Sequence, residues 1–159
     1  MRKVRKFDQE EMLAAKQELL LTRNFKLDKE VTAAYTGGTI VLLKDGRFAL
    51  GLKDETISLI HVDTGRLFGR LAEENEAVIT FCVSPNQQIL VTTTKNYLVK
   101  AYRLPQLPEP DSEEPQVWQP QHFQTFRLTG CLGVELTVDP TSRYVAVGTS
   151  DSQIKVYDL

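Results

Sequence analysis

The sequence repeats itself about every 42 residues, and this period constrains the possible fold more than any other feature. Ile60 and Tyr102 fill one slot in successive units and lie 42 residues apart, whereas Tyr102 and Tyr157 lie 55 residues apart. The difference of 13 residues between the two intervals is close to the length of an acidic, proline-rich insertion over residues 105–120. A turn residue with a carboxylate or carboxamide side chain precedes the third strand-like run of each unit. These three structural turn residues are Asp54, Asn96 and Asp151.

Each unit consists of short apolar runs joined by tight turns, as in an antiparallel meander. Asp45-Gly46 separates the first two runs, and this dipeptide indicates a hairpin because glycine accepts the positive φ of the turn. Four short strands per unit at this period predict a β-propeller. The expected strands are 39–43, 48–52, 56–62 and 66–71; then 77–83, 88–93, 97–104 and 122–128; then 133–138, 143–149 and 153–159.

These patterns divide the chain into a leader over residues 1–30 and a partial propeller over residues 31–159. In the leader, Asp8 and Glu11 have the spacing of a capping box, and leucines recur near a period of 3.6, so we expect an amphipathic helix over 8–22. The expected blades are about 35–74, 75–130 with the acidic insertion 105–120, and 131–159. The last blade is incomplete, so we expect further blades or a partner to close the ring.

The third unit resembles a WD40 repeat. Residues 138–151 are similar to the turn-and-strand core of that family, and Ile154 to Asp158 to its closing strand, with Tyr157 in the tryptophan position. In the second unit Arg103 stands where the family has the terminal aspartate. The resemblance implies an all-β fold, an incomplete WD40-type β-propeller of about 2.75 four-stranded blades with an amino-terminal α-helix. No Gly-His dipeptide precedes any unit, so the family's Asp-His-Ser/Thr-Trp relay is not expected to assemble.

Residues 24–83 carry a narrower resemblance. Asn24-Phe25-Lys26, Tyr35-Thr36-Gly37-Gly38 and the acidic run 73–76 before Ala77 are similar to the amino-terminal stretch of the transducin beta-like WD40 subunits of the small-subunit processome. The resemblance implies a non-catalytic scaffold in ribosome biogenesis and rRNA processing, within a small nucleolar ribonucleoprotein. Its implied partners are other WD40 propeller subunits, with peripheral pre-rRNA contact. The implied location is the nucleolus in the nucleus; without the resemblance we expect the cytoplasm.

Composition narrows the function classes. The net charge of −2 argues against a dominant nucleic-acid surface, and no apolar run is long enough to span a membrane. Cys82 and Cys131 have no metal-ligand spacing around them, and neither His61 nor His122 forms a motif with a cysteine. We therefore expect no enzymatic activity, no cofactor, no metal, no membrane and no small-molecule substrate.

Two features are candidate contacts for partners. Four basic residues could contact RNA phosphates or act as a nuclear address, or could form a solvated start of the chain: Arg2, Lys3, Arg5 and Lys6. Trp118 lies in the acidic insertion and is a candidate anchor for a partner if exposed; alternatively, it folds back on its own blade.

Two other functions remain open at this stage. One is a WD40 adaptor in another assembly, such as a signalling complex, a vesicle coat or a ubiquitin ligase. The other is a propeller enzyme whose active site lies outside these residues. Identification of co-purifying subunits separates all three.

Overall fold

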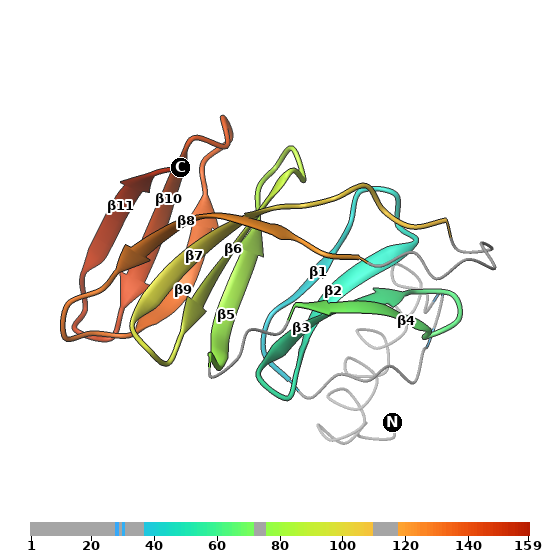
Figure 1. Ribbon diagram of the computed structural model, residues 1–159, viewed down its shortest axis with the longest axis horizontal. Coiled ribbons are helices and arrows are strands. Elements are labelled where there is room, and N and C mark those ends of the chain that lie inside the picture. The colour runs from blue at the N-terminus through green and yellow to red at the C-terminus, as the bar shows by residue number, and fades with distance from the viewer. Residues whose placement is uncertain (1–27, 29, 31–36, 72–75, 110–117) are drawn as a thin grey trace, which may run out of the picture. The chain divides into compact units, whose positions relative to one another are not determined.

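The computed structural model describes residues 28, 30, 37–71, 76–109 and 118–159. The chain divides into two units, residues 1–30 and 31–159, and the described residues of the second unit form eleven strands (Figure 1). The helix predicted over 8–22 lies outside the described residues. The strands are β1 (Ile40–Leu42), β2 (Phe48–Lys53), β3 (Thr56–His61), β4 (Leu67–Leu71), β5 (Val78–Val83), β6 (Ile89–Thr94), β7 (Leu98–Arg103), β8 (Gln121–Arg127), β9 (Gly133–Val138), β10 (Tyr144–Thr149) and β11 (Ile154–Asp158).

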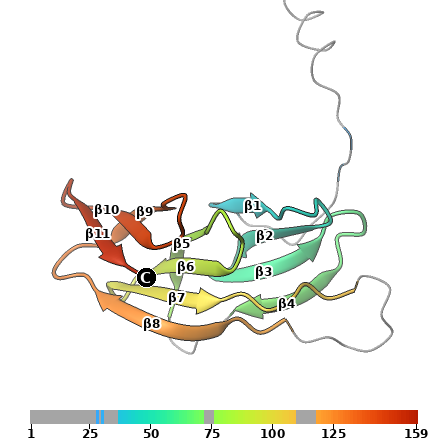
Figure 2. The same ribbon diagram turned by 90° about the horizontal axis from the view of Figure 1, so that it is seen from above.

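The strands pair in chain order into three antiparallel sheets (Figure 2). The first is β1-β2-β3-β4, the second β5-β6-β7-β8 and the third β9-β10-β11. This arrangement confirms the predicted all-β meander. The first strand is shorter than expected, because Leu43 already begins the hairpin turn, where its carbonyl accepts a hydrogen bond from the Gly46 amide at 2.9 Å.

The turn between the first two strands has the same geometry in all three sheets. The amide of its fourth residue donates to the carbonyl of its first at 2.8 to 2.9 Å, and that fourth residue has a positive φ. The residues with positive φ are Gly46, Gln87 and Ser142, with φ of 69°, 59° and 61°. A type I turn followed by a left-handed residue is a common hairpin connection, so these turns set the register of each strand pair.

The second sheet is buried on both faces. Leu90 of β6 packs in an apolar cluster with Phe48 and Leu59 of the first sheet, whereas its neighbour Val91 packs with Val145 of the third. Successive residues of a strand point to opposite faces, so β6 contributes to both clusters. The hydrophobic core therefore consists of two layers, each between adjacent sheets.

Polar contacts also join adjacent sheets. The Thr39 and Thr80 hydroxyls lie 2.7 Å apart, and the Val78 amide donates to the Glu55 carbonyl at 2.9 Å. Between the second and third sheets, the Thr93 hydroxyl donates to the Gly133 carbonyl at 2.8 Å. A Cβ atom at Gly133 would lie only 2.5 Å from Thr93 Cγ2, so this close approach requires glycine.

Candidate functional site

The segment over residues 118–127, which we call the rim segment, contacts all three sheets. It packs on Gly69 of the first sheet through Trp118 and then forms β8 at the edge of the second (Figure 1). Gln124 Nε2 donates to the Asp158 carbonyl of the third sheet at 3.2 Å, and the Phe126 ring centroid lies 4.5 Å from that of Tyr157. The rim segment therefore links the outer edges of three successive blades.

Trp118 does not occupy the exposed position considered from the sequence. It is 3% exposed and belongs to the apolar cluster between the first and second sheets, so it does not fold back on the second blade alone. A Cβ atom at Gly69 would lie 2.9 Å from Trp118 Cβ, so the missing side chain at Gly69 makes room for the indole. The residues before it, 110–117, lie outside the described residues.

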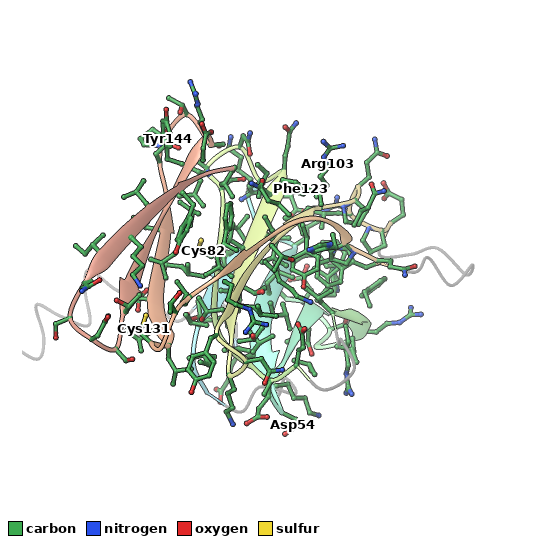
Figure 3. All side chains as sticks on the ribbon, turned by 60° about the vertical axis from the view of Figure 1, so that its left-hand side comes forward. Asp54, Cys82, Arg103, Phe123, Cys131 and Tyr144 are labelled. Carbon is green, nitrogen blue, oxygen red and sulfur yellow. The ribbon has the colours of Figure 1, made fainter. Side chains whose placement is uncertain are left out.

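The three aligned turn residues lie between the second and third strands of their sheets and are exposed. The residue after each has a positive φ: Glu55, Tyr97 and Ser152, with φ of 62°, 63° and 63°. Asp54, in the first of these turns, lies at the opposite end of the sheets from Arg103 (Figure 3). Asp54, Asn96 and Asp151 thus mark one end of the blades, and Arg103 marks the other.

A hydrogen-bond network follows the third of these turns. The Thr149 hydroxyl donates to Asp151, and this bond is the main reason why the pKa of that carboxyl is lowered. Lys155 Nζ donates to Cys131 Sγ at 3.2 Å, and the positive charge of Lys155 makes a smaller contribution to the lowered pKa of Asp151. The bond to Cys131 is the largest cause of the raised pKa of Lys155. In this blade the network uses a thiol and an ammonium group, without histidine.

Neither histidine approaches a cysteine in a metal-binding arrangement. His61 Nδ1 lies 2.9 Å from Thr64 Oγ1 with its ring against Phe48, and His122 Nε2 lies 2.7 Å from Thr125 Oγ1. In the described residues no group of three histidine, cysteine or acidic side chains could hold a metal ion. Each histidine thus forms a hydrogen bond with a threonine three residues later in the chain.

Both cysteines are free thiols. Burial raises the pKa of Cys82 to about 12, with a smaller contribution from the charge of Glu135. Such a thiol is almost wholly protonated at neutral pH and is a poor nucleophile. Cys82 therefore acts as a packing residue between the second and third sheets.

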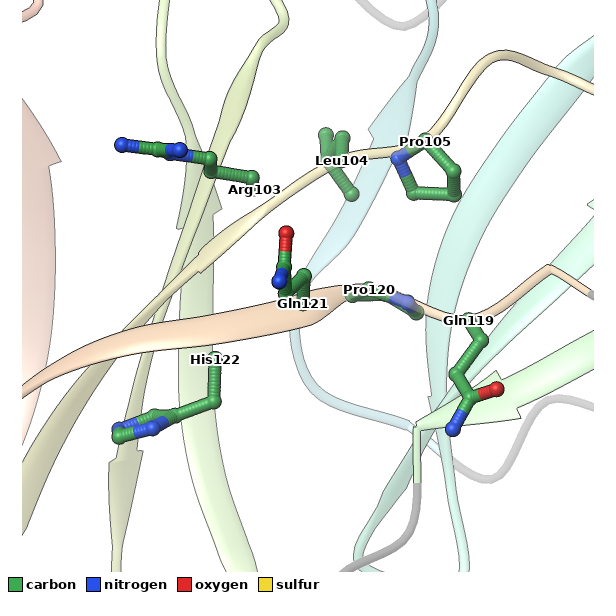
Figure 4. A pocket seen from close by; sticks show the side chains of 7 residues that line it. All are labelled: Arg103, Leu104, Pro105, Gln119, Pro120, Gln121 and His122. Atoms are coloured by element: carbon green, nitrogen blue, oxygen red, sulfur yellow. The ribbon is translucent and has the colours of Figure 1, made fainter.

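A surface groove of about 640 Å³ opens where β7 ends and β8 begins (Figure 4). Residues 103–105 line one side and residues 119–122 the other. We call it the β8 groove. Sequence reasoning did not identify this site. The available signal was Arg103, a basic residue in place of the aspartate expected at the end of that strand.

The candidate contacts at the start of the chain lie outside the described residues: Arg2, Lys3, Arg5 and Lys6. Within the described part of the chain, no helix has the length and apolar character needed to cross a membrane.

The sequence is similar to transducin beta-like protein 3 of several mammals. It is 23% identical to the cattle protein (Bos taurus) and to the human protein (Homo sapiens), over 137 residues in each case. Each match covers 86% of this chain and 16% of the relative, so the chain spans about a sixth of the length of these curated relatives. No protein-family model matches the chain.

Two solved propeller structures resemble the fold. The β-propeller domain of Cps50 (Swd1) from Myceliophteria thermophila has a TM-score of 0.64 at 15% identity, covering 76% of this chain and 39% of that domain. The C-terminal WD40 domain of Sif2 has a TM-score of 0.59 at 11% identity, covering 76% of this chain and 33% of that domain. The fold of the described sheets is that of a WD40-type β-propeller.

Proposed function

We propose that this chain is a non-catalytic scaffold that presents the turns and edges of propeller blades to neighbouring proteins in a large assembly. One observation carries the proposal: a match to transducin beta-like protein 3 over 86% of the chain coincides with a WD40-type propeller fold. Two buried layers hold the sheets together, and polar side chains occupy the turns at their ends. Rigid blades with exposed polar ends suit protein recognition.

The proposed assembly is the small-subunit processome, acting in early pre-rRNA processing in the nucleolus. Support comes from the resemblance of residues 24–83 to the processome WD40 subunits and from the similarity to transducin beta-like protein 3. The proposed direct partners are other WD40 propeller subunits. RNA contact is proposed to be peripheral and electrostatic, through the four basic residues at the start of the chain: Arg2, Lys3, Arg5 and Lys6.

Affinity purification of the tagged full chain from cells, followed by mass spectrometry, tests the proposal. We expect processome subunits to be enriched over a control purification with an unrelated WD40 propeller carrying the same tag. Recovery should survive nuclease treatment, because the proposed partners are proteins. Enrichment of coat or ubiquitin-ligase subunits instead would place the chain in a different assembly.

A variant with glutamine at all four basic positions of the leader separates protein contacts from RNA contacts: Arg2, Lys3, Arg5 and Lys6. It should retain the protein partners and lose only salt-sensitive RNA recovery. Loss of every partner in this variant would make the leader the main contact, in place of the blades.

A further inference from the structure

We propose that the outer edge of β8, together with the β8 groove, binds an extended acidic peptide segment of a partner protein by strand addition. The inference rests on the proposed scaffold role and specifies one of its contact surfaces. Its two parts come from different observations: an open sheet edge and a polar groove that begins at the same strand.

The edge of β8 has backbone groups available for pairing. β8 is the last strand of the second sheet, and no strand in the described residues pairs with its outer side. The Leu128 amide donates inward, to the Tyr97 carbonyl at 2.7 Å. Antiparallel pairing alternates inward and outward residues, so the amides of Arg127 and Thr125 point outward. An extended peptide can pair with this edge through its main chain.

The β8 groove provides side-chain recognition at the first residues of that strand. Arg103 stacks its guanidinium over the Phe123 ring at 5.4 Å and forms no ion pair with any described residue. Gln119 and Gln121 are exposed, and Figure 4 shows them on the segment that leads into β8, whereas Arg103 lies on the other segment that borders the groove. A volume of about 640 Å³ accommodates several peptide residues.

The charge of this surface favours an acidic occupant. Residues 103–105 and 119–128 include Arg103, Arg127 and His122 and no acidic residue. A guanidinium binds a carboxylate with two parallel hydrogen bonds. A peptide is favoured over RNA because the outward amides and carbonyls of a strand edge match a peptide main chain, which RNA lacks. β8 has seven residues, so the segment is expected to be about seven residues long.

Fluorescence polarisation on the purified full chain tests this surface. The probes are labelled seven-residue peptides with glutamate at alternate positions and varied apolar residues between, beside matched peptides with glutamine for glutamate. We expect saturable binding of the acidic set, about tenfold weaker binding of the glutamine set, and weakening with salt. A single-stranded oligouridylate of similar charge should bind more weakly than the acidic peptides.

Two variants separate the edge from the groove. Thr125→Pro removes an outward amide without removing a β7–β8 hydrogen bond, and should weaken binding at least about tenfold. Thr125→Ala is its matched control, because it also loses the hydroxyl contact to His122 but keeps the amide, and should bind like the wild type. Arg103→Glu reverses the charge at the groove and should weaken binding at least about tenfold. This test does not depend on whether the Thr125→Pro variant folds.

The inference is overturned if no acidic peptide binds, if RNA binds more tightly than every peptide, or if Thr125→Pro with an unchanged melting temperature binds as well as Thr125→Ala. Unchanged binding by Arg103→Glu also overturns it. None of these results decides the scaffold role, which depends on the subunits recovered from cells.

Discussion

Lys155 Nζ donates a hydrogen bond to Cys131 Sγ at 3.2 Å. Lys155 lies on β11 of the third sheet, and Cys131 lies in the connection between β8 and β9. The equivalent positions of the second sheet, 55 residues earlier, are Lys100 and Glu76. Their Nζ and Oε2 atoms lie 2.6 Å apart. A lysine of the third strand thus contacts the residue two positions before the first strand in both blades. The partner differs, a thiol in one and a carboxylate in the other, while the position is kept.

The pair in the second sheet is expected to contribute to stability because both side chains are largely buried, 12% exposed for Lys100 and 18% for Glu76. Glu76→Ala removes the carboxylate that lies 2.6 Å from the buried ammonium group, and should lower the free energy of unfolding by about 3 kcal/mol. Urea denaturation measures the free energy of unfolding of each variant. Lys95 and Glu55 form a matched ion pair with both side chains more than half exposed, so Glu55→Ala should cost less than about 1 kcal/mol. Equal losses in the two variants would contradict this prediction.

The contact between Gly133 and Thr93 predicts a pair of compensating substitutions. Gly133→Ala places a Cβ atom 2.5 Å from Thr93 Cγ2 and should destabilise the chain by about 1–3 kcal/mol. Adding Thr93→Ser removes that methyl group but keeps the hydroxyl that donates to the Gly133 carbonyl, so it should restore part of the loss; Thr93 Cβ and Val147 Cγ1 still lie 3.1 Å from the added atom. Thermal unfolding followed by circular dichroism compares the single and double variants.

Gly148→Ala is the control for this pair. A Cβ atom there would lie 3.5 Å from Glu135 Cβ, an ordinary contact, so the change should stay within about 0.5 kcal/mol. A double variant no more stable than Gly133→Ala alone would show that the threonine methyl does not cause the loss.

Trp118 is the only tryptophan in the chain, so its fluorescence reports on the rim segment directly. Because the indole is buried against the first sheet, its native emission should resist acrylamide quenching and shift to longer wavelength on unfolding. Trp118→Ala should lower the free energy of unfolding by about 3–5 kcal/mol, and Trp118→Phe by less. Quenching of the native chain at the rate of free tryptophan would place the side chain in solvent.

The strands could be predicted because their determinants are local. Asp45-Gly46 defines a hairpin within four residues, and apolar runs on both sides continue it. Tyr97 and Ser152 occupy equivalent positions in successive units, and both have a positive φ. The sequence period alone is therefore enough to align these two turns. Pattern reasoning succeeds where neighbours in sequence determine the backbone.

The site depends on contacts that no local pattern records. Trp118 packs against Gly69, 49 residues earlier, and only the missing side chain at that glycine makes the contact possible. The β8 groove forms because the two ends of one insertion diverge there. Predicting it requires the knowledge that Arg103 on β7 pairs with Gln121 on β8. The link between Lys155 and Cys131 likewise depends on side-chain reach across a sheet.

The outer face of the third sheet predicts self-association. Ile154 is 77% exposed and Val156 is 63% exposed, and they stand opposite Gly148 and Ala146 on β10. Exposed apolar strands promote association between copies. Light scattering should detect oligomers that grow with concentration, and the double variant Ile154→Lys with Val156→Lys should reduce them. Gln153→Lys, which adds a charge at a neighbouring exposed residue, should have a smaller effect; a wild-type monomer at every concentration would contradict the prediction.

The turn of the third sheet predicts a specific pH dependence at Asp139. Its carboxylate accepts hydrogen bonds from the Thr141 amide at 2.9 Å, the Arg143 amide at 2.8 Å and the Tyr144 amide at 2.6 Å, and from the Thr141 hydroxyl. The Thr141 hydroxyl is the largest cause that lowers the pKa of Asp139 from 3.8 to about 2, followed by the Tyr144 amide. A carboxyl with a depressed folded-state pKa stabilises the fold above its unfolded pKa and loses that contribution as the pH falls through the folded value.

Asp139→Asn should therefore lower the melting temperature at pH 7, where the wild-type carboxylate makes its full contribution. The difference between the two proteins should shrink as the pH falls from about 4 to about 2, because the wild-type carboxyl then becomes protonated. Melting curves across this range measure the difference. Thr141→Val removes the hydroxyl donor, so it should raise the pKa of Asp139 in a carboxyl NMR titration. A difference in melting temperature that stays constant down to pH 2 would show that the charge of Asp139 does not stabilise this turn.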